Sequence, residues 1–457
     1  MSEKKKTITF AVAALVLLLL AAVTAPRHSE PDQFADLGEK FFPEFTDPNI
    51  ATTLEVIEFD EATAAARPFK VTFKGGIWTI PSHHDYPADG KDQLAKTAAG
   101  MIGLNKEDFR TSNIADHESC GVIDPLDETA TTLKGRGKRV TIRDNDDRIL
   151  ADLIFGKKLE GRADYSFVRV PGQKRVYITK TDLSISTQFA DWIEPDLLKT
   201  EQTKIQKVTL QDYSINERTR SVDERGTLVL TKGSDSTWKA NRMPSSEEVD
   251  TTKMDAMLRA IDELSIVGVR PKPEGLSRDL RRSDGSVPIS QENLISLQEK
   301  GYYFTRDGRL LSNEGELNVE TSDGIEYTLR FGEVLFGSGE TVTAGATAAE
   351  QEGAEKGPGE NRYLFLTASF QPNLIPEPRK PSNTNFESKP ESEWNDEDRA
   401  NKDLKAKHDE WQASIETGRT KADELNSHFA GWYYVISSEA FDKIHLNRSE
   451  LLKKKES

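Results

Sequence analysis

Two histidines followed by an aspartate, His83-His84-Asp85, are the side chains of this sequence that most resemble a metal site. A transition-metal centre needs three or four converging ligands, each supported by further hydrogen bonds. The segment stands between Pro81 and Pro87, in a loop before a helical pattern, and supplies only these three groups. We therefore expect a solvated polar loop here rather than a metal centre.

A second candidate is Asp116-His117-Glu118-Ser119-Cys120, which places an imidazole three residues before the only cysteine. Cysteine catalysis requires a thiolate stabilised by a positioned imidazole or by a helix N-terminus. Two carboxylates adjoin the histidine, and their negative charge disfavours a thiolate. The pattern favours an ordinary loop that ends in a half-buried cysteine.

Three weaker patterns complete the search for chemistry. Gly337-Ser338-Gly339-Glu340-Thr341 has glycines but lacks the Gly-Lys-Ser/Thr ending of a phosphate-binding loop. The basic cluster Lys134-Gly135-Arg136-Gly137-Lys138-Arg139 predicts a turn between strands, with a local anion contact as the alternative. Trp78 and Trp238 are either core residues or a platform for stacking a ligand. We therefore predict no enzyme, and no catalytic, cofactor-binding or metal-binding residue.

The elements around these patterns occur twice. Phe69 to Phe73 alternates like a strand and leads through Trp78 to an amphipathic helical segment with Leu94, Ala98, Met101 and Leu104. Trp238 follows Trp78 at an offset of 160 residues, and the same offset brings a second helical set, Met254, Leu258, Ile261 and Leu264. Strands that end in Phe155-Gly156 and Phe331-Gly332 extend the match. The sequence therefore predicts an internal duplication.

The second half of the duplication is interrupted. In the first copy, Tyr165 to Val170 and Arg175 to Thr179 flank a Pro-Gly turn and predict a hairpin. In the second copy, the partner of the strand Tyr363 to Thr367 is Tyr433 to Ser437, far along the chain. Residues 371–431 therefore form an insertion, Pro-rich at first and helical from about Ser392. Its narrow apolar stripe favours either a helix lying on its own domain or a docking element for a partner helix.

An uncharged apolar run, Thr7 to Ala25, follows Lys4-Lys5-Lys6 near the start of the chain. Nineteen residues at helical rise span roughly 28 Å, close to the thickness of the hydrocarbon core of a bilayer. The lysines favour a cytoplasmic N-terminus and an extracytoplasmic bulk. The alternative is a cleaved signal peptide, but Pro26 directly follows the only suitable cleavage site, so we expect a retained anchor in the inner (cell) membrane.

Composition agrees with a soluble body behind one anchor. The formal net charge is −16, from 77 acidic and 61 basic residues, which disfavours binding to nucleic acid. With one cysteine, no intramolecular disulfide can form. We predict an α+β fold of two tandem repeats, each an antiparallel sheet with a covering helix, behind one transmembrane helix. The expected parts are a tail 1–6, a transmembrane helix 7–25, a linker 26–52, a first repeat 53–199, and a second repeat 203–453 with insertions at 337–360 and 371–431.

With these residues in place, the layout resembles bacterial envelope proteins that carry domain of unknown function 4340, counted here as two copies. The resemblance implies a companion of export assemblies of the ABC type and brings no catalytic motif. We therefore expect a membrane-tethered, non-enzymatic accessory or scaffold of an envelope transport assembly, with protein partners in the membrane and the lipid bilayer itself bound through Thr7 to Ala25. The alternative function is an extracytoplasmic binding module for a glycan, peptide or lipid, which would use the groove between the two copies.

Overall fold

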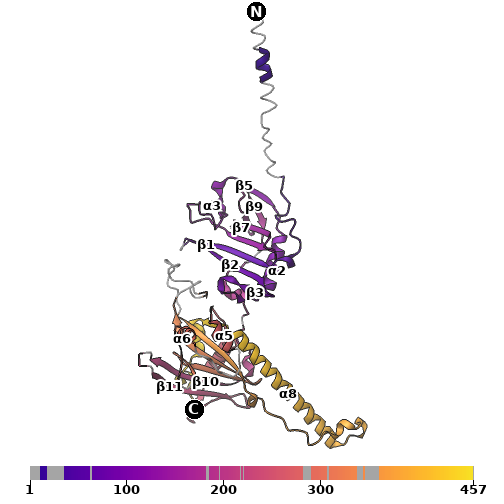
Figure 1. The fold of residues 1–457 in the computed structure, drawn as a ribbon, viewed down its shortest axis with the longest axis vertical. Coiled ribbons are helices and arrows are strands. Elements are labelled where there is room, and N and C mark those ends of the chain that lie inside the picture. Colours follow the sequence, from indigo (N-terminus) through magenta and orange to yellow (C-terminus); the bar gives the residue numbers. More distant parts are fainter. Residues whose placement is uncertain are drawn as a thin grey trace, which may run out of the picture.

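The computed structural model describes residues 11–17, 35–61, 64–181, 185–194, 196–216, 218–219, 221–280, 290–305, 308–336, 343–344 and 360–455. Two antiparallel sheets with associated helices dominate this part of the chain (Figure 1). The prediction of a mixed α and β fold built on antiparallel sheets is therefore confirmed. We call the two sheets, with the segments packed on them, the first and the second body.

Within the described residues, the first sheet has nine strands in the order β4-β3-β2-β1-β6-β7-β8-β9-β5. β1 is an inner strand of this sheet, and its Leu54 and Val56 are fully buried while the intervening residue is not, as alternation predicts. The strands are β1 (Thr53–Asp60), β2 (Ala65–Lys74), β3 (Ile77–Ile80), β4 (Tyr86–Pro87), β5 (Asp108–Thr111), β6 (Lys138–Arg143), β7 (Ile149–Leu159), β8 (Arg162–Arg169) and β9 (Val176–Lys180).

The second sheet repeats this order. Its eight described strands run β12-β11-β10-β17-β18-β19-β20-β14, which matches β3-β2-β1-β6-β7-β8-β9-β5 position by position. These strands are β10 (Ile205–Asn216), β11 (Ser221–Lys232), β12 (Trp238–Ala240), β14 (Gly268–Pro271), β17 (Glu316–Thr321), β18 (Ile325–Leu335), β19 (Asn361–Phe370) and β20 (Trp432–Ile436). Two short ladders lie outside it, between β13 (Glu247–Val249) and β21 (Leu452–Lys454) and between β15 (Tyr302–Phe304) and β16 (Leu310–Ser312).

Each sheet carries one amphipathic helix at the same point of its strand order. These are α2 (Lys91–Ile102), which buries Leu94, Ala98 and Met101, and α4 (Thr251–Asp262), which buries Met254, Leu258 and Ile261. The side chain of Asp250 caps α4 by accepting hydrogen bonds from the amides of residues 252 and 253. Further described helices of the two bodies are α3 (His117–Cys120), α5 (Glu274–Leu280), α6 (Gln291–Gln298), α8 (Asp396–Phe429), α9 (Ser438–Ile444) and α10 (Arg448–Leu451).

The two Phe-Gly pairs mark the place where another segment crosses each sheet. A Cβ atom on Gly156 would overlap the carbonyl oxygen of Cys120, and one on Gly332 would overlap the carbonyl oxygen of Lys300. Glycine at these positions lets a second backbone lie directly on the strand. The prediction that these pairs end their strands is wrong, because β7 continues to Leu159 and β18 to Leu335. The glycine of each pair is a packing requirement that both bodies share.

The two bodies meet through an aromatic junction, and one hydrophobic core runs through both. The ring of Tyr86, at the edge of the first sheet, lies edge-on to Trp432 at 4.9 Å. Tyr86 also hydrogen-bonds Tyr434, and the hydroxyl of Tyr327 donates to the carbonyl of Leu198 at 2.7 Å. Burial raises the pKa of Tyr434 well above its usual value, so both tyrosines remain neutral donors at physiological pH.

The start of the chain is described in two pieces. Residues 11–17 form a helix, and the rest of the predicted transmembrane segment 7–25 and the tail 1–6 lie outside the described residues. In the described part, no helix has both the length and the apolar character needed to cross a bilayer. Residues 35–52, predicted as linker, pack on the first sheet: Phe41 and Phe45 are buried, and Tyr177 donates to Asp36 at 2.5 Å. The described residues of the predicted linker therefore pack as part of the first body.

Candidate functional site

His83 and His84 point in different directions. The ring of His83 is buried and stacks on Phe189 at 4.5 Å, while its Nδ1 lies 2.9 Å from the hydroxyl of Ser82. Burial lowers the pKa of His83 to about 4, so the ring is neutral at physiological pH. His84 is exposed, and its Nε2 lies 2.8 Å from the carbonyl of Ala344. The described residues hold no group of three or more metal-ligating side chains, and the expectation of a wholly solvated loop fails for His83.

Cys120 is fully buried rather than half-buried, at the end of the single-turn helix α3. The Nε2 atom of His117 lies 2.9 Å from the carbonyl of Lys174, and since a carbonyl only accepts, this nitrogen carries the proton. Burial lowers the pKa of His117. The imidazole is thus anchored to the backbone, and Cys120 packs with Val122 in a small apolar cluster.

Two arginines of the basic cluster 134–139 form contacts within the first body. Arg136 lies over the ring of Phe59 at 4.3 Å and donates to the carbonyls of Asp124, Pro125 and Ala130. Arg139 forms ion pairs with Asp152 and Asp124 at 2.7 and 3.1 Å. The cluster therefore ties the loop 124–136 to the first sheet.

The remaining sequence candidates do not come together either. Trp78 and Trp238 are half-buried and pack against the common core of the two bodies, each in its own sheet. The glycine-rich segment 337–341, and the predicted loop insertion 337–360 apart from residues 343, 344 and 360, lie outside the described residues.

A cleft lies at the junction of the two bodies. Its volume is about 390 Å³, and it is lined by Phe69, His83 and Phe189 of the first body and by Val267 of the second. The Nε2 atom of His83 is buried and has no hydrogen-bond partner in the described part of the chain. A cleft of this kind is what the alternative function, an extracytoplasmic binding module, requires.

The insertion between β19 and β20 contains the long helix α8, of which the sequence predicted the helical character but not the packing. The C-terminal part of α8 packs on β19: Ala422, Leu425 and Phe429 are buried, and the side chain of Asn426 hydrogen-bonds both the amide and the carbonyl of Ala368. A Cβ atom on Gly418 would overlap the ring of Phe370, so this glycine marks where the helix leaves the sheet. N-terminal to Gly418, α8 projects away from the second body (Figure 1).

The projecting part, residues 375–417, is called the arm. Its Pro-rich segment runs back along α8, with most of its residues exposed. At the base, the indole of Trp411 donates to the carbonyl of Ile375 at 3.1 Å. Near the tip, the indole of Trp394 donates to the carbonyl of Phe386 at 3.1 Å, and Lys389 pairs with Asp398 at 2.8 Å. These contacts at both ends give the arm a defined shape.

The tip of the arm is acidic and accessible. The carboxylates of Glu391, Glu393, Asp396 and Glu397 are exposed, and they stand at the start of α8, where the helix dipole favours negative charge. Asn395 caps the helix in a capping box with Asp398. Lys389 and the amide of Asn395 lower the pKa of Asp398, so this carboxylate stays ionised and holds the tip together.

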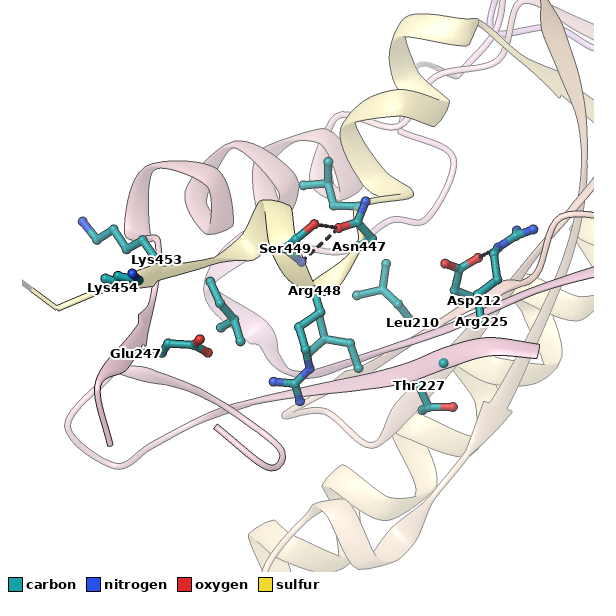
Figure 2. Close-up of a pocket in the computed structure, with 14 residues that line it drawn as sticks. Leu210, Asp212, Arg225, Thr227, Glu247, Asn447, Arg448, Ser449, Lys453 and Lys454 are labelled. Atoms are coloured by element: carbon teal, nitrogen blue, oxygen red, sulfur yellow. Dashed lines mark hydrogen bonds and ion pairs between the residues drawn. The ribbon is translucent and has the colours of Figure 1, made fainter. Parts of the chain in front are cut away.

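A groove opens on the second body between the β10–β11 hairpin and the C-terminal segment (Figure 2). Its volume is about 650 Å³, and leucines 210, 228, 446 and 452 contribute its apolar part. At one end Asp212 pairs with Arg225 at 2.6 Å, and from α10 the guanidinium of Arg448 reaches Asn241. No sequence pattern predicts this groove, because its two sides, residues 210–247 and 446–454, lie about 200 positions apart in the chain. A local signal is Asn447, which forms a capping box with Glu450.

The fold around these sites is defined by the repeated strand order, the helices α2 and α4, and the two Phe-Gly pairs. Residues 78–279 match the family described as Domain of unknown function (DUF4340). The predicted resemblance to this family is confirmed. The DUF4340 match starts at Trp78 and ends in α5, so it runs once across the boundary between the two sheets, whereas the sequence analysis counted two copies.

The DUF4340 match contains His83, Cys120 and both amphipathic helices. The arm lies beyond it, and so does the C-terminal half of the groove lining. No curated protein and no solved structure matches the chain.

Proposed function

We propose that this protein is a membrane-tethered, non-enzymatic accessory or scaffold of a bacterial envelope transport assembly of the ABC type, and that it docks its partner through the arm. In this proposal Thr7 to Ala25 holds the chain in the inner membrane, and two tandem repeats, each a sheet with a covering helix, form the extracytoplasmic bulk. The observation that carries the proposal is the arm itself.

Three properties of the arm support a docking role. It projects from the body, so a partner can reach it from several sides (Figure 1). It is ordered by its own hydrogen bonds, so little conformational entropy is lost when it binds. Its tip presents exposed carboxylates, which favour a basic partner surface and fast association.

The outer half of β11 offers a second contact. Residues 221–226 pair with β10 on one side, and on the other side no described strand covers them, because β12 pairs only with residues 230–232. An uncovered strand edge can accept an extended segment of a partner. The arm and this edge belong to the same body, so one partner could contact both.

Site-specific photo-crosslinking tests the docking role. A photoreactive amino acid at the exposed position Glu391 or Arg399 of the arm should crosslink to a membrane-protein partner in intact cells. Exposed Lys96 on α2 is the matched control, since it is also a helical surface position. Replacing residues 376–410 by a short Gly-Ser linker is structurally permitted, because Trp411 contacts Ile375 directly.

This deletion should leave both sheets folded and remove the partner from complexes purified in detergent. Equal crosslinking from the arm and from α2, or full recovery of the partner without the arm, would contradict the docking role.

The tethering is tested separately. A reporter enzyme that is active only outside the cytoplasm, fused after Ser457, should be active, and mass spectrometry of the purified chain should find residues 1–25 retained. A fusion that is active only in the cytoplasm, or a mature chain that starts near Pro26, would refute the tether and leave the docking role of the arm to be judged by crosslinking alone.

A further inference from the structure

A cavity in the first body lies between the end of the β8–β9 hairpin and the loop that follows α3. Its volume is about 660 Å³, within the range usual for small-molecule sites. It lies inside the DUF4340 match and far along the chain from the arm. The residues that matter for the argument are Ile114, His117, Leu126, Arg169 and Lys174.

Arg169 forms the floor of this cavity and is only 6% exposed. Its Nε atom donates to the carbonyl of Val122 at 2.8 Å, and Nη1 donates to the carbonyl of Gln173 at 2.9 Å. Among the described residues, Nη2 has no hydrogen-bond partner and the guanidinium has no ion pair. Burial lowers the pKa of Arg169, yet arginine remains charged in proteins. The cavity therefore contains a buried positive charge whose Nη2 donor is not used by any described residue.

The two nearby carboxylates are already engaged. Asp124 pairs with Arg139 at 3.1 Å, and Asp127 accepts hydrogen bonds from the amide and the hydroxyl of Thr129 at 2.9 and 2.6 Å. Both carboxylates favour the charged form of Arg169 without bonding to it. Among the described residues, the guanidinium of Arg169 therefore offers the cavity a positive charge and a free N–H donor, and a bound anion can pair with both.

The second sheet shows that the fold does not need an arginine here. Phe155 pairs with Val168 in the first sheet and Phe331 pairs with Leu364 in the second, so Arg169 and Phe365 occupy equivalent positions. Phe365 is fully buried, with Tyr302 at 5.3 Å. The second body thus fills with aromatic rings the space that the first body leaves open.

The mouth of the cavity is apolar and carries one more cation. Ile114 is 58% exposed and Leu126 is 50% exposed, which is high for large aliphatic side chains. Lys174 lines the same opening, and its carbonyl is held by the ring of His117 at 2.9 Å. A buried cation under an aliphatic rim matches a molecule with a carboxylate at one end and a short hydrocarbon chain.

We propose that this cavity binds an aliphatic monocarboxylate, whose carboxylate accepts a hydrogen bond from Nη2 of Arg169 and whose chain lies against Ile114 and Leu126. The proposal does not depend on the docking role of the arm. Lys174 adds a second positive charge at the entrance, and the backbone contact of His117 fixes the segment that carries Lys174.

Equilibrium dialysis of radiolabelled octanoate against the full-length chain in detergent tests the proposal, with protein-free micelles as the blank. Octanoate should bind the wild-type chain, and unlabelled octanoate should displace it at least tenfold more effectively than methyl octanoate or acetate. Arg169→Gln should weaken octanoate binding about tenfold or more, because a charged hydrogen bond is lost. Arg162→Gln, on the same strand but outside the cavity, is the matched control and should bind as wild type.

Two surface variants keep the test decisive if Arg169→Gln fails to fold. Leu126→Ser should weaken octanoate binding with little effect on acetate, and Lys174→Gln should weaken both. Octanoate binding that is unchanged in all three cavity variants, or equal displacement by the methyl ester, would overturn the proposal.

Discussion

Replacing Gly332 by alanine should destabilise the second body by about 3 kcal/mol. The added methyl group would overlap the carbonyl oxygen of Lys300, which is itself bonded to the amide of Glu333 at 2.9 Å. Neither backbone can move without breaking this hydrogen bond or the pairing of β18. The same change at Gly156, where the crossing carbonyl belongs to Cys120, should have a similar effect on the first body.

Urea unfolding followed by circular dichroism measures this effect. Gly431→Ala is the matched control, because a Cβ atom there has no heavy atom within 4 Å. The control should stay within about 0.5 kcal/mol of wild type. If Gly332→Ala and Gly431→Ala behave alike, the crossing segment is not held tightly on the strand.

Replacing Lys272 by methionine should stabilise the protein at pH 7, by about 1 to 4 kcal/mol. Lys272 is 5% exposed, and its ammonium donates to the carbonyl of Phe429 at 3.1 Å and lies 3.9 Å from the ring centre of Phe365. Among the residues that the structure describes, it has no carboxylate partner. Burial lowers the pKa of Lys272 well below its usual value. At neutral pH, folding must therefore either remove a proton from the Lys272 ammonium or bury its positive charge, and both cost free energy.

The pH dependence has a definite sign. Because the pKa is lower in the folded state, the unfolded state binds more protons between the folded pKa and about 10.4, and wild-type stability rises with pH in that window. The advantage of Lys272→Met should therefore shrink between pH 7 and pH 9.5. The buried tyrosines contribute equally to the pH dependence of both proteins, so their contribution cancels in the difference between the two free energies of unfolding.

Denaturant unfolding at several pH values checks this, with Lys253→Met on the exposed face of α4 as the control for losing a surface charge. A loss of stability in Lys272→Met that does not vary with pH would mean that the ammonium stays charged in the core. Its contacts with Phe429 and Phe365 would then have to outweigh the cost of burial.

Several elements of the fold are visible in the sequence because they depend on local patterns. Trp78 and Trp238 each lie on a short strand next to the longer strand of a hairpin, and the helical sets built on Leu94 and Met254 form α2 and α4. Alternation, turn residues and a fixed offset are sufficient to find such elements. The long-range pairing of β19 with β20 was found only because the uninterrupted first copy served as a template.

Other features depend on contacts that no local pattern records. Phe41 and Phe45 stand among prolines and acidic residues and indicate a linker, yet they enter the first core. The Pro-rich segment of the arm is ordered because the indoles of Trp394 and Trp411 find backbone carbonyls. Arg169 lies on the face of β8 that also carries Tyr165 and Phe167, but nothing in the local pattern shows that its guanidinium is buried. The comparison with Phe365 in the folded sheets shows its unusual position.

The arm also separates two strands that must find each other during folding. Arg169 pairs with Val176 only seven residues away, whereas Leu364 pairs with Tyr434 seventy residues away. A tenfold longer loop adds about 2 kcal/mol to the entropic cost of closure. This cost is smaller if the arm forms first, because the flexible part of the loop is then shorter. The N-terminal sheet should therefore assemble early and the C-terminal sheet should close last. Until β20 arrives, the free edge of β19 is exposed to misassembly in a newly synthesised chain.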